Sequence, residues 1–260
     1  MNRNNYLKLL LCLLITGCMT TQKKTDKRAV NQQFEVKSDT LNFYDKSRNR
    51  LIPVALYEPN TDKKITGQKI VIFSHGYGEN KGGDNLLYSY LTENLASNAY
   101  FVASIQHELS TDSLLATTGI PQITRRSNWE RGAENIRFVL NELKKTKPEL
   151  DYSHLILIGH SNGGDMTALF ARKYPDLVDK IITLDNRRMA LPVTDHPKIY
   201  SIRSSDFPAD EGVLPNSEDQ KKFKMQIVKL NNTKHNEMDN DANEIQRKEI
   251  NDLIISFLNN

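Results

Sequence analysis

The fold is decided by nine residues, Leu155-Ile156-Leu157-Ile158-Gly159-His160-Ser161-Asn162-Gly163. The apolar run that opens them predicts a buried strand, and Met166, Leu169 and Phe170 follow with the spacing of a helix face. Glycines on both sides of Ser161 permit a sharp strand-to-helix turn that exposes the hydroxyl. The start of the helix directs N–H groups and a positive dipole end toward developing negative charge. This G-x-S-x-G turn therefore predicts a nucleophilic Ser161; the alternative is a glycine-rich structural turn.

Short apolar runs on either side of this turn alternate with stretches of helical spacing. Strands that are buried on both faces and separated by helices indicate a mainly parallel sheet with helices on each face, a three-layer α/β sandwich. Residues 34–57 are expected to open the sheet with an antiparallel pair of strands. The other expected strands are 70–73, 100–105, 155–158, 181–184, 199–202 and 225–230, and apolar helix faces are expected at Ile136, Val139, Leu140 and Leu143 and at Ile250, Leu253, Ile254 and Phe257.

Length and composition indicate one globular domain. A chain of 260 residues can bury a substantial core without a disulfide. It carries 35 basic and 32 acidic residues, without a basic stripe interleaved with aromatics, so no nucleic-acid partner is expected. The sequence has no HExxH, Cys/His cluster or calcium-loop pattern, so neither a metal nor a cofactor is expected. The oligomeric state is left open.

The N-terminus has the pattern of a bacterial lipoprotein signal. Arg3 and Lys8 precede an apolar run, 9–15, that is shorter than the roughly 20 residues that span a bilayer. Ile15-Thr16-Gly17-Cys18 resembles a lipobox, in which the chain is cut before the cysteine and the cysteine is lipidated; a plain signal peptide is the alternative. The expected divisions are a signal peptide at 1–17, a lipidated Cys18 with a flexible tether at 18–33, and a single α/β domain at 34–260.

Cysteine usage agrees with an exported protein. Both cysteines, Cys12 and Cys18, lie in this leader, so the mature domain has neither a disulfide nor a cysteine nucleophile. The expected location is the bacterial cell envelope, with the membrane as a partner through Cys18. Met19 follows where inner-membrane lipoproteins of enteric-type bacteria often carry Asp, and this resemblance points to an outer membrane.

Residues 108–130 form a long connection with little periodicity between an expected strand and an expected helix. Connections of this length inside a compact domain are often functional. We expect this segment to form a cap or rim over the site, with a plain surface insertion as the alternative.

The turn at Ser161 resembles that of the α/β-hydrolase superfamily, and the resemblance extends from about residue 34 to the C-terminus. Residues 131–140 resemble a helix of bacterial relatives of platelet-activating-factor acetylhydrolase and dienelactone hydrolase, which belong to the esterase and acylhydrolase branch. This resemblance implies an α/β-hydrolase fold and a triad in the chain order serine, acid, histidine.

The family places its base after the last strand, which here implies His235 within residues 231–238. A surface histidine is the alternative. His160 adjoins Ser161, where its ring is expected to point away from the hydroxyl, and His107 is expected at the rim of the site. The remaining histidines are His75 in a loop, His154 at a strand start and His196 in a loop.

The acid must accept a hydrogen bond from the imidazole and stabilise the imidazolium. Asp206, after the penultimate strand, occupies the family's usual position and is the first choice. Asp185 ends the preceding strand, from which some family members take their acid, and it ranks second before Asp210. The alternative for each is a loop or helix-cap carboxylate.

An oxyanion hole needs two backbone N–H donors about 3 Å from the developing charge. The turn supplies one from Asn162. The loop Ser74-His75-Gly76-Tyr77-Gly78 resembles the family's HG loop, which implies a second donor at Tyr77; a flexible turn is the alternative. The pairs Arg187-Arg188 and Arg125-Arg126 could bind an anionic group, but charged pairs in loops are usually solvated, and no role is assigned to them.

Together these residues predict a serine hydrolase that cleaves small carboxylic esters through an acyl-enzyme. Thioester, lactone or peptide cleavage stays open, since all use the same constellation. A non-catalytic envelope binding protein on the same scaffold is the alternative from another class.

Overall fold

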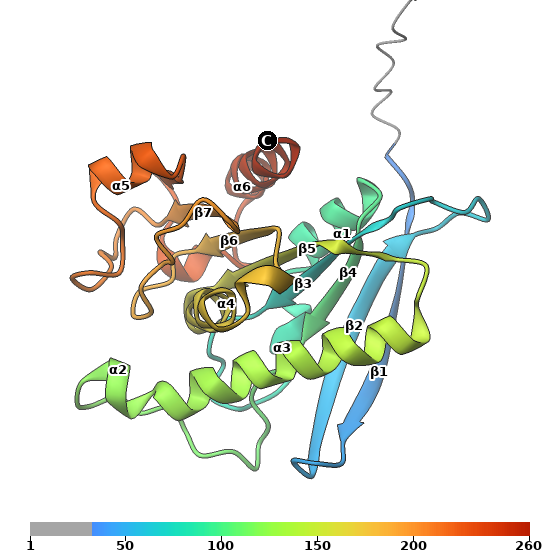
Figure 1. The fold of residues 1–260 in the computed structure, drawn as a ribbon, viewed down its shortest axis with the longest axis horizontal. Coiled ribbons are helices and arrows are strands. Elements are labelled where there is room, and N and C mark those ends of the chain that lie inside the picture. The colour runs from blue at the N-terminus through green and yellow to red at the C-terminus, as the bar shows by residue number, and fades with distance from the viewer. Residues whose placement is uncertain (1–32) are drawn as a thin grey trace, which may run out of the picture. The chain divides into compact units, whose positions relative to one another are not determined.

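The computed structural model describes residues 33–260, which form an eight-stranded sheet with helices on both faces (Figure 1). The expected signal peptide, Cys18 and nearly all of the expected tether lie outside the described residues. Along the sheet the strands follow the order β1-β2-β4-β3-β5-β6-β7-β8. The strands are β1 (Val36–Asp45), β2 (Arg50–Pro59), β3 (Lys69–Ser74), β4 (Phe101–Ile105), β5 (Asp151–His160), β6 (Lys180–Leu184), β7 (Lys198–Arg203) and β8 (Gln226–Lys229).

The pairing of these strands confirms the expected sheet. β1 pairs antiparallel with β2, and β2 pairs antiparallel with β4. From β4 through β8 every neighbouring pair is parallel. Parallel neighbours require crossover connections, and these are supplied mainly by helices. The helices are α1 (Ser89–Ser97), α2 (Pro121–Thr124), α3 (Arg126–Thr146), α4 (Ser161–Lys173), α5 (Ser217–Lys222) and α6 (Glu244–Asn259), with short 3-10 turns at Asp84–Leu86, Pro175–Leu177 and His235–Glu237.

Two hydrophobic cores, one on each face of the sheet, account for the three layers. On one face, α3 and α4 bury side chains such as Ile136 and Leu169 against the sheet. The helices α1 and α6 lie on the other face (Figure 1). They bury Leu95 and Ile254. Burial of apolar surface at about 25 cal/mol per Å² is the main stabilising contribution of both layers. The predicted helix faces of α3 and α6 are therefore confirmed.

The segment 108–130 is less irregular than the sequence suggested. It contains the short helix α2, and α3 already begins at Arg126. Leu115 and Thr117 from its first part line a cavity that reaches Ser161. Within residues 33–260, we find no helix with the length and apolarity needed to cross a membrane.

Candidate active site

The turn between β5 and α4 holds Ser161 in a strained conformation. Its φ of 51° lies in the left-handed region, which is uncommon for a residue with a side chain. A Cβ on Gly163 would lie 2.3 Å from the carbonyl oxygen of Ser74, and one on Gly159 would lie 2.4 Å from that of Gly163. These backbone atoms cannot move aside cheaply, so both positions require glycine. Close packing of β5, α4 and the end of β3 thus presents the Ser161 hydroxyl at the carboxyl edge of the sheet.

His235 lies beside this hydroxyl. The imidazole Nε2 is 2.9 Å from Ser161 Oγ, and Nδ1 is 2.5 Å from Asp185 Oδ2. A carboxylate only accepts hydrogen bonds, so Nδ1 carries the proton and Nε2 offers its lone pair to the serine. The imidazole comes from the short 3-10 turn after β8, which is the loop that the family resemblance implied.

The carboxylate beside His235 is that of Asp185, not that of Asp206, so the order of the acid candidates is corrected. Asp185 directly follows β6, next to β5 in the sheet, and is fully buried. Asp206 is exposed, and its Oδ1 accepts from the backbone N–H of His235 at 2.8 Å. It therefore fastens the histidine loop without reaching the ring. Asp210 instead pairs with Arg188 at 2.5 Å.

Asp185 is held as an anion although it is buried. Burial by itself would raise the pKa of this carboxyl, but the hydrogen bond from His235 and the Arg203 guanidinium at 2.8 Å outweigh it. Ser204 adds hydrogen bonds from its backbone N–H at 3.0 Å and its hydroxyl at 2.8 Å. The net result is a lowered pKa, so the carboxylate is charged at neutral pH and can stabilise an imidazolium.

His160 has a structural role, as expected from its position next to the serine. Its ring is buried, and Nδ1 lies 2.7 Å from the hydroxyl of Tyr88. That hydroxyl accepts from the Gly76 N–H at 3.0 Å, so it donates its own proton to His160. Burial and the neighbouring charge of His235 lower the pKa of His160 to about 3. The ring stays neutral and packs against His235 without adding charge to the site.

The two expected oxyanion donors border the serine. Tyr77 follows β3 and lines both hollows that open at Ser161, and Asn162 is the next residue along the turn. The Tyr77 hydroxyl accepts from the Leu115 N–H at 2.9 Å, which ties the HG-type loop to the segment 108–130.

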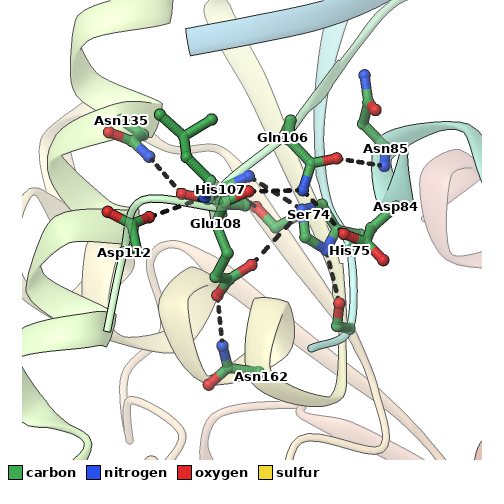
Figure 2. Close-up of polar contacts among 12 residues, drawn as sticks. Ser74, His75, Asp84, Asn85, Gln106, His107, Glu108, Asp112, Asn135 and Asn162 are labelled. Atoms are coloured by element: carbon green, nitrogen blue, oxygen red, sulfur yellow. Dashed lines mark hydrogen bonds and ion pairs between the residues drawn. The ribbon is translucent and has the colours of Figure 1, made fainter. Parts of the chain in front are cut away.

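The side chain of Asn162 is anchored below the turn. Its amide donates to Glu108 Oε1 at 3.0 Å and to Asn128 Oδ1 at 2.9 Å, and its oxygen accepts from the Trp129 indole at 2.8 Å. Figure 2 shows the Glu108 carboxylate directed at Asn162. All of these groups are buried. The network fixes Asn162, the second residue of α4, from which a backbone N–H would reach an oxyanion.

His107 is not a rim residue, which corrects the sequence-based expectation. It is 1% exposed, and its Nε2 lies 3.0 Å from the Ser74 hydroxyl (Figure 2). Burial keeps its pKa well below the ordinary value. Its backbone N–H donates to Nε2 of His75 at 2.9 Å, so His75 is a neutral structural group as well. The sequence pattern missed this burial because α3 covers the end of β4 only in the folded chain.

Residues 33–260 thus have the α/β-hydrolase fold, and Ser161, His235 and Asp185 have the geometry of a serine hydrolase triad. Glu108, Asn128 and Trp129 were missed as supports of the turn, since nothing in the local pattern connects them with it.

Comparisons with known proteins agree with this class. The sequence matches the Hydrolase_4 family, described as serine aminopeptidase, S33, over residues 66–184. No curated protein sequence matches the chain.

Solved structures with the same fold include several esterases. The esterase Est22 is 13% identical with a TM-score of 0.60, covering 84% of this chain and 80% of its own. A fungal esterase from Rhizomucor miehei is 12% identical with a TM-score of 0.62, covering 87% and 84%. The dienelactone hydrolase-like promiscuous phosphotriesterase P91, from metagenomic libraries, is 17% identical with a TM-score of 0.54, covering 77% and 84%. At these identities the likeness concerns the fold alone.

Proposed function

We propose that this protein is a serine hydrolase that cleaves carboxylic esters of small molecules. The observation that carries the proposal is the unbroken hydrogen-bonded line from Asp185 through His235 to Ser161. A serine hydroxyl is a weak nucleophile unless an adjacent base removes its proton, and this line supplies the base and its orienting carboxylate. The esterase neighbours, and one that is dienelactone hydrolase-like, support an ester over other acyl substrates.

In the proposed reaction, Ser161 Oγ attacks the ester carbonyl while His235 Nε2 takes its proton. The oxyanion accepts from the backbone N–H groups of Tyr77 and Asn162. Collapse of the intermediate breaks the bond to the alcohol, which leaves with the proton from His235. Water, deprotonated by the same nitrogen, then attacks the acyl-enzyme and releases the acid. Asp185 stabilises the imidazolium in both steps.

A fluorophosphonate probe and a series of p-nitrophenyl esters of increasing chain length test this proposal. We expect labelling at Ser161 and ester turnover, both lost in Ser161→Ala. Folded wild-type protein that is neither labelled nor active would refute the proposal and favour a binding protein. Because the family match is described as a serine aminopeptidase, aminoacyl p-nitroanilides belong in the same assay. Faster cleavage of these amides than of the esters would replace the esterase by a peptidase.

We also propose that the protein is anchored to the bacterial cell envelope through a lipid on Cys18. The lipobox-like residues 15–18 support this location. The resemblance of residues 131–140 to acylhydrolase relatives supports a substrate that carries an acyl ester.

A further inference from the structure

Ser161 opens onto two hollows of opposite charge. One, with a volume of about 360 Å³, is lined by Asp84, Asp239 and Asp241 together with His235. The other, of about 200 Å³, contains Arg125, Arg187 and Arg188 and is called the arginine cavity below. The remaining lining residues of the arginine cavity are Tyr77, Leu115, Thr117, Ser161, Asn162 and Asp165.

Two of the three arginines in the cavity, Arg125 and Arg187, have no ion-pair partner among residues 33–260. Arg188 pairs with Asp210 at 2.5 Å. Among residues 33–260, Arg125 and Arg187 form no ion pair within 4.0 Å, although both are partly buried. Arg125 donates through Nε to the Ala116 carbonyl at 2.9 Å, which leaves the guanidinium facing the cavity. Burial and then the positive charges of Arg188 and Arg187 lower the pKa of Arg125, so these cations repel one another.

Arg187 is held next to the proposed base. Its guanidinium lies 4.3 Å from the centre of the Phe207 ring, and this ring meets His235 edge-on at 5.7 Å. Its Nε is buried without a hydrogen-bond partner within the described part of the chain. A stacked guanidinium with unsatisfied donors, beside a nucleophile, is suited to bind a planar oxyanion.

The charged groups around the arginine cavity have a net charge of one positive unit, which suits a ligand group with one negative charge. Asp165 is 3% exposed, and its Oδ1 accepts from the N–H groups of Arg188 and Met189 at 3.0 and 2.8 Å. Asp165 and Asp210 therefore balance two of the three arginines and leave one positive charge. The acidic hollow on the other side of Ser161 repels an anion, so both sides favour the same orientation.

We propose that the arginine cavity binds a carboxylate that the ester substrate carries, with Arg187 and Arg125 as its partners. This inference rests on the proposed esterase activity and names its substrate class: half-esters of dicarboxylic acids, or esters of hydroxy acids. A substrate carboxylate between Arg125 and Arg187 would accept charge-assisted hydrogen bonds from both guanidinium groups. Its negative charge would also offset the repulsion between them.

Matched pairs of esters, assayed at neutral pH with the full-length protein, test the proposal. For the acyl side, the mono-p-nitrophenyl ester of glutaric acid is compared with p-nitrophenyl pentanoate. For the alcohol side, p-acetoxybenzoate is compared with its methyl ester. We expect kcat/KM of the acidic member to exceed that of the neutral member by about 10-fold or more in one pair, which also identifies the side that enters the cavity. In Arg187→Met we expect this ratio to fall by about 10- to 100-fold, the range for a hydrogen bond to a charged group.

Arg126→Met is the control, because Arg126 follows Arg125 in the chain, is 49% exposed and pairs with Glu130 outside the cavity. It should keep the wild-type ratio. The ratio is the readout because a disturbed Phe207 contact would slow both esters of a pair alike. Two outcomes would overturn the inference and leave the proposed function standing. In the first, the protein hydrolyses neutral esters and does not prefer the acidic ester in either pair. In the second, it prefers an acidic ester, but Arg187→Met leaves that preference unchanged. Absence of ester hydrolysis and of fluorophosphonate labelling would overturn both.

Discussion

Asp185 and Asp206 both contact His235, but they contact different parts of it. Asp185 accepts from the ring nitrogen and is buried, whereas Asp206 accepts from the backbone N–H and is exposed. Only the first contact can fix the tautomer and compensate a positive imidazolium, because the second leaves the ring untouched.

This difference predicts opposite outcomes for two equivalent substitutions. Asp185→Asn should lower kcat for p-nitrophenyl acetate by about 10⁴-fold, since the amide favours the wrong tautomer. Asp206→Asn should keep kcat within about tenfold, because the amide oxygen still accepts from the His235 N–H. Circular dichroism would verify that both variants are folded. If Asp206→Asn proved to be the inactive variant, the assignment of the acid would be wrong.

Asp165 predicts a stability effect that depends on pH. Burial raises its pKa to about 6 from 3.8, against the opposing hydrogen bonds from Met189 and Arg188. A raised acid pKa means that the folded state holds the proton more tightly, so wild-type stability falls as pH rises from about 4 to about 6. Asp165→Asn cannot ionise and should escape this loss. The unfolding free energy of the variant relative to wild type should rise by up to about 3 kcal/mol between pH 4 and pH 7.

Urea denaturation of wild type and Asp165→Asn at each pH measures this difference in unfolding free energy. Groups that titrate equally in the two proteins contribute equally to both, so they drop out of the difference. A difference that is constant with pH would show that Asp165 is already ionised at about pH 4 in the folded protein.

At the scale of elements, the Glu108 network joins the segment after β4 to the start of α4 (Figure 2). It also joins this segment to α3 through Asn128. Its Oε1 accepts from both Asn162 and Asn128, while Oε2 is buried without a hydrogen-bond partner among the described residues. Only Oε1 of Glu108 therefore holds the network together, and Oε2 is a buried oxygen that makes no hydrogen bond.

Glu108→Gln should therefore keep the network, with its carbonyl oxygen in the place of Oε1. We expect stability at least equal to that of the wild type and kcat within a few fold. Glu108→Ala should lose about 1–3 kcal/mol of stability, since it leaves the Asn162 and Asn128 amides short of an acceptor. It should also lower kcat more than it changes KM, because the Asn162 N–H is a proposed oxyanion donor. Equal kinetics of the Ala and Gln variants would show that the network does not position this donor.

Local patterns predicted the strands and the serine turn, whereas His235 was implied by the resemblance to α/β-hydrolases, which place their base after the last strand. The apolar runs and the glycines on both sides of Ser161 can be read along the chain, although the backbone that excludes a Cβ at Gly163 belongs to Ser74. The choice between Asp185 and Asp206 depends on how two loops fold over the sheet edge, which no local pattern contains. The same holds for His107, which α3 covers, and for Arg125 and Arg187, which approach one another from distant segments.

At the scale of the whole molecule, the two cysteines offer a test of the proposed envelope anchor. Cys18 ends the lipobox-like residues 15–18, whereas Cys12 lies in the apolar run before them. Buried acyl chains contribute about 0.8 kcal/mol per methylene, and stable anchoring takes more than one chain or signal. Cys18→Ser should therefore move the protein, expressed in a bacterium, from the membrane to the soluble fraction.

Cys12→Ser is the matched control, because it also replaces a cysteine sulfur by oxygen, six residues before Cys18. This variant should stay in the membrane fraction. Incorporation of radiolabelled palmitate, absent only in Cys18→Ser, would identify the lipid. Ester hydrolysis per molecule should be the same in both variants, because residues 33–260 contain the whole proposed site. If neither cysteine changes the fractionation, the leader is an ordinary signal peptide, and the proposed hydrolase acts without a lipid on Cys18.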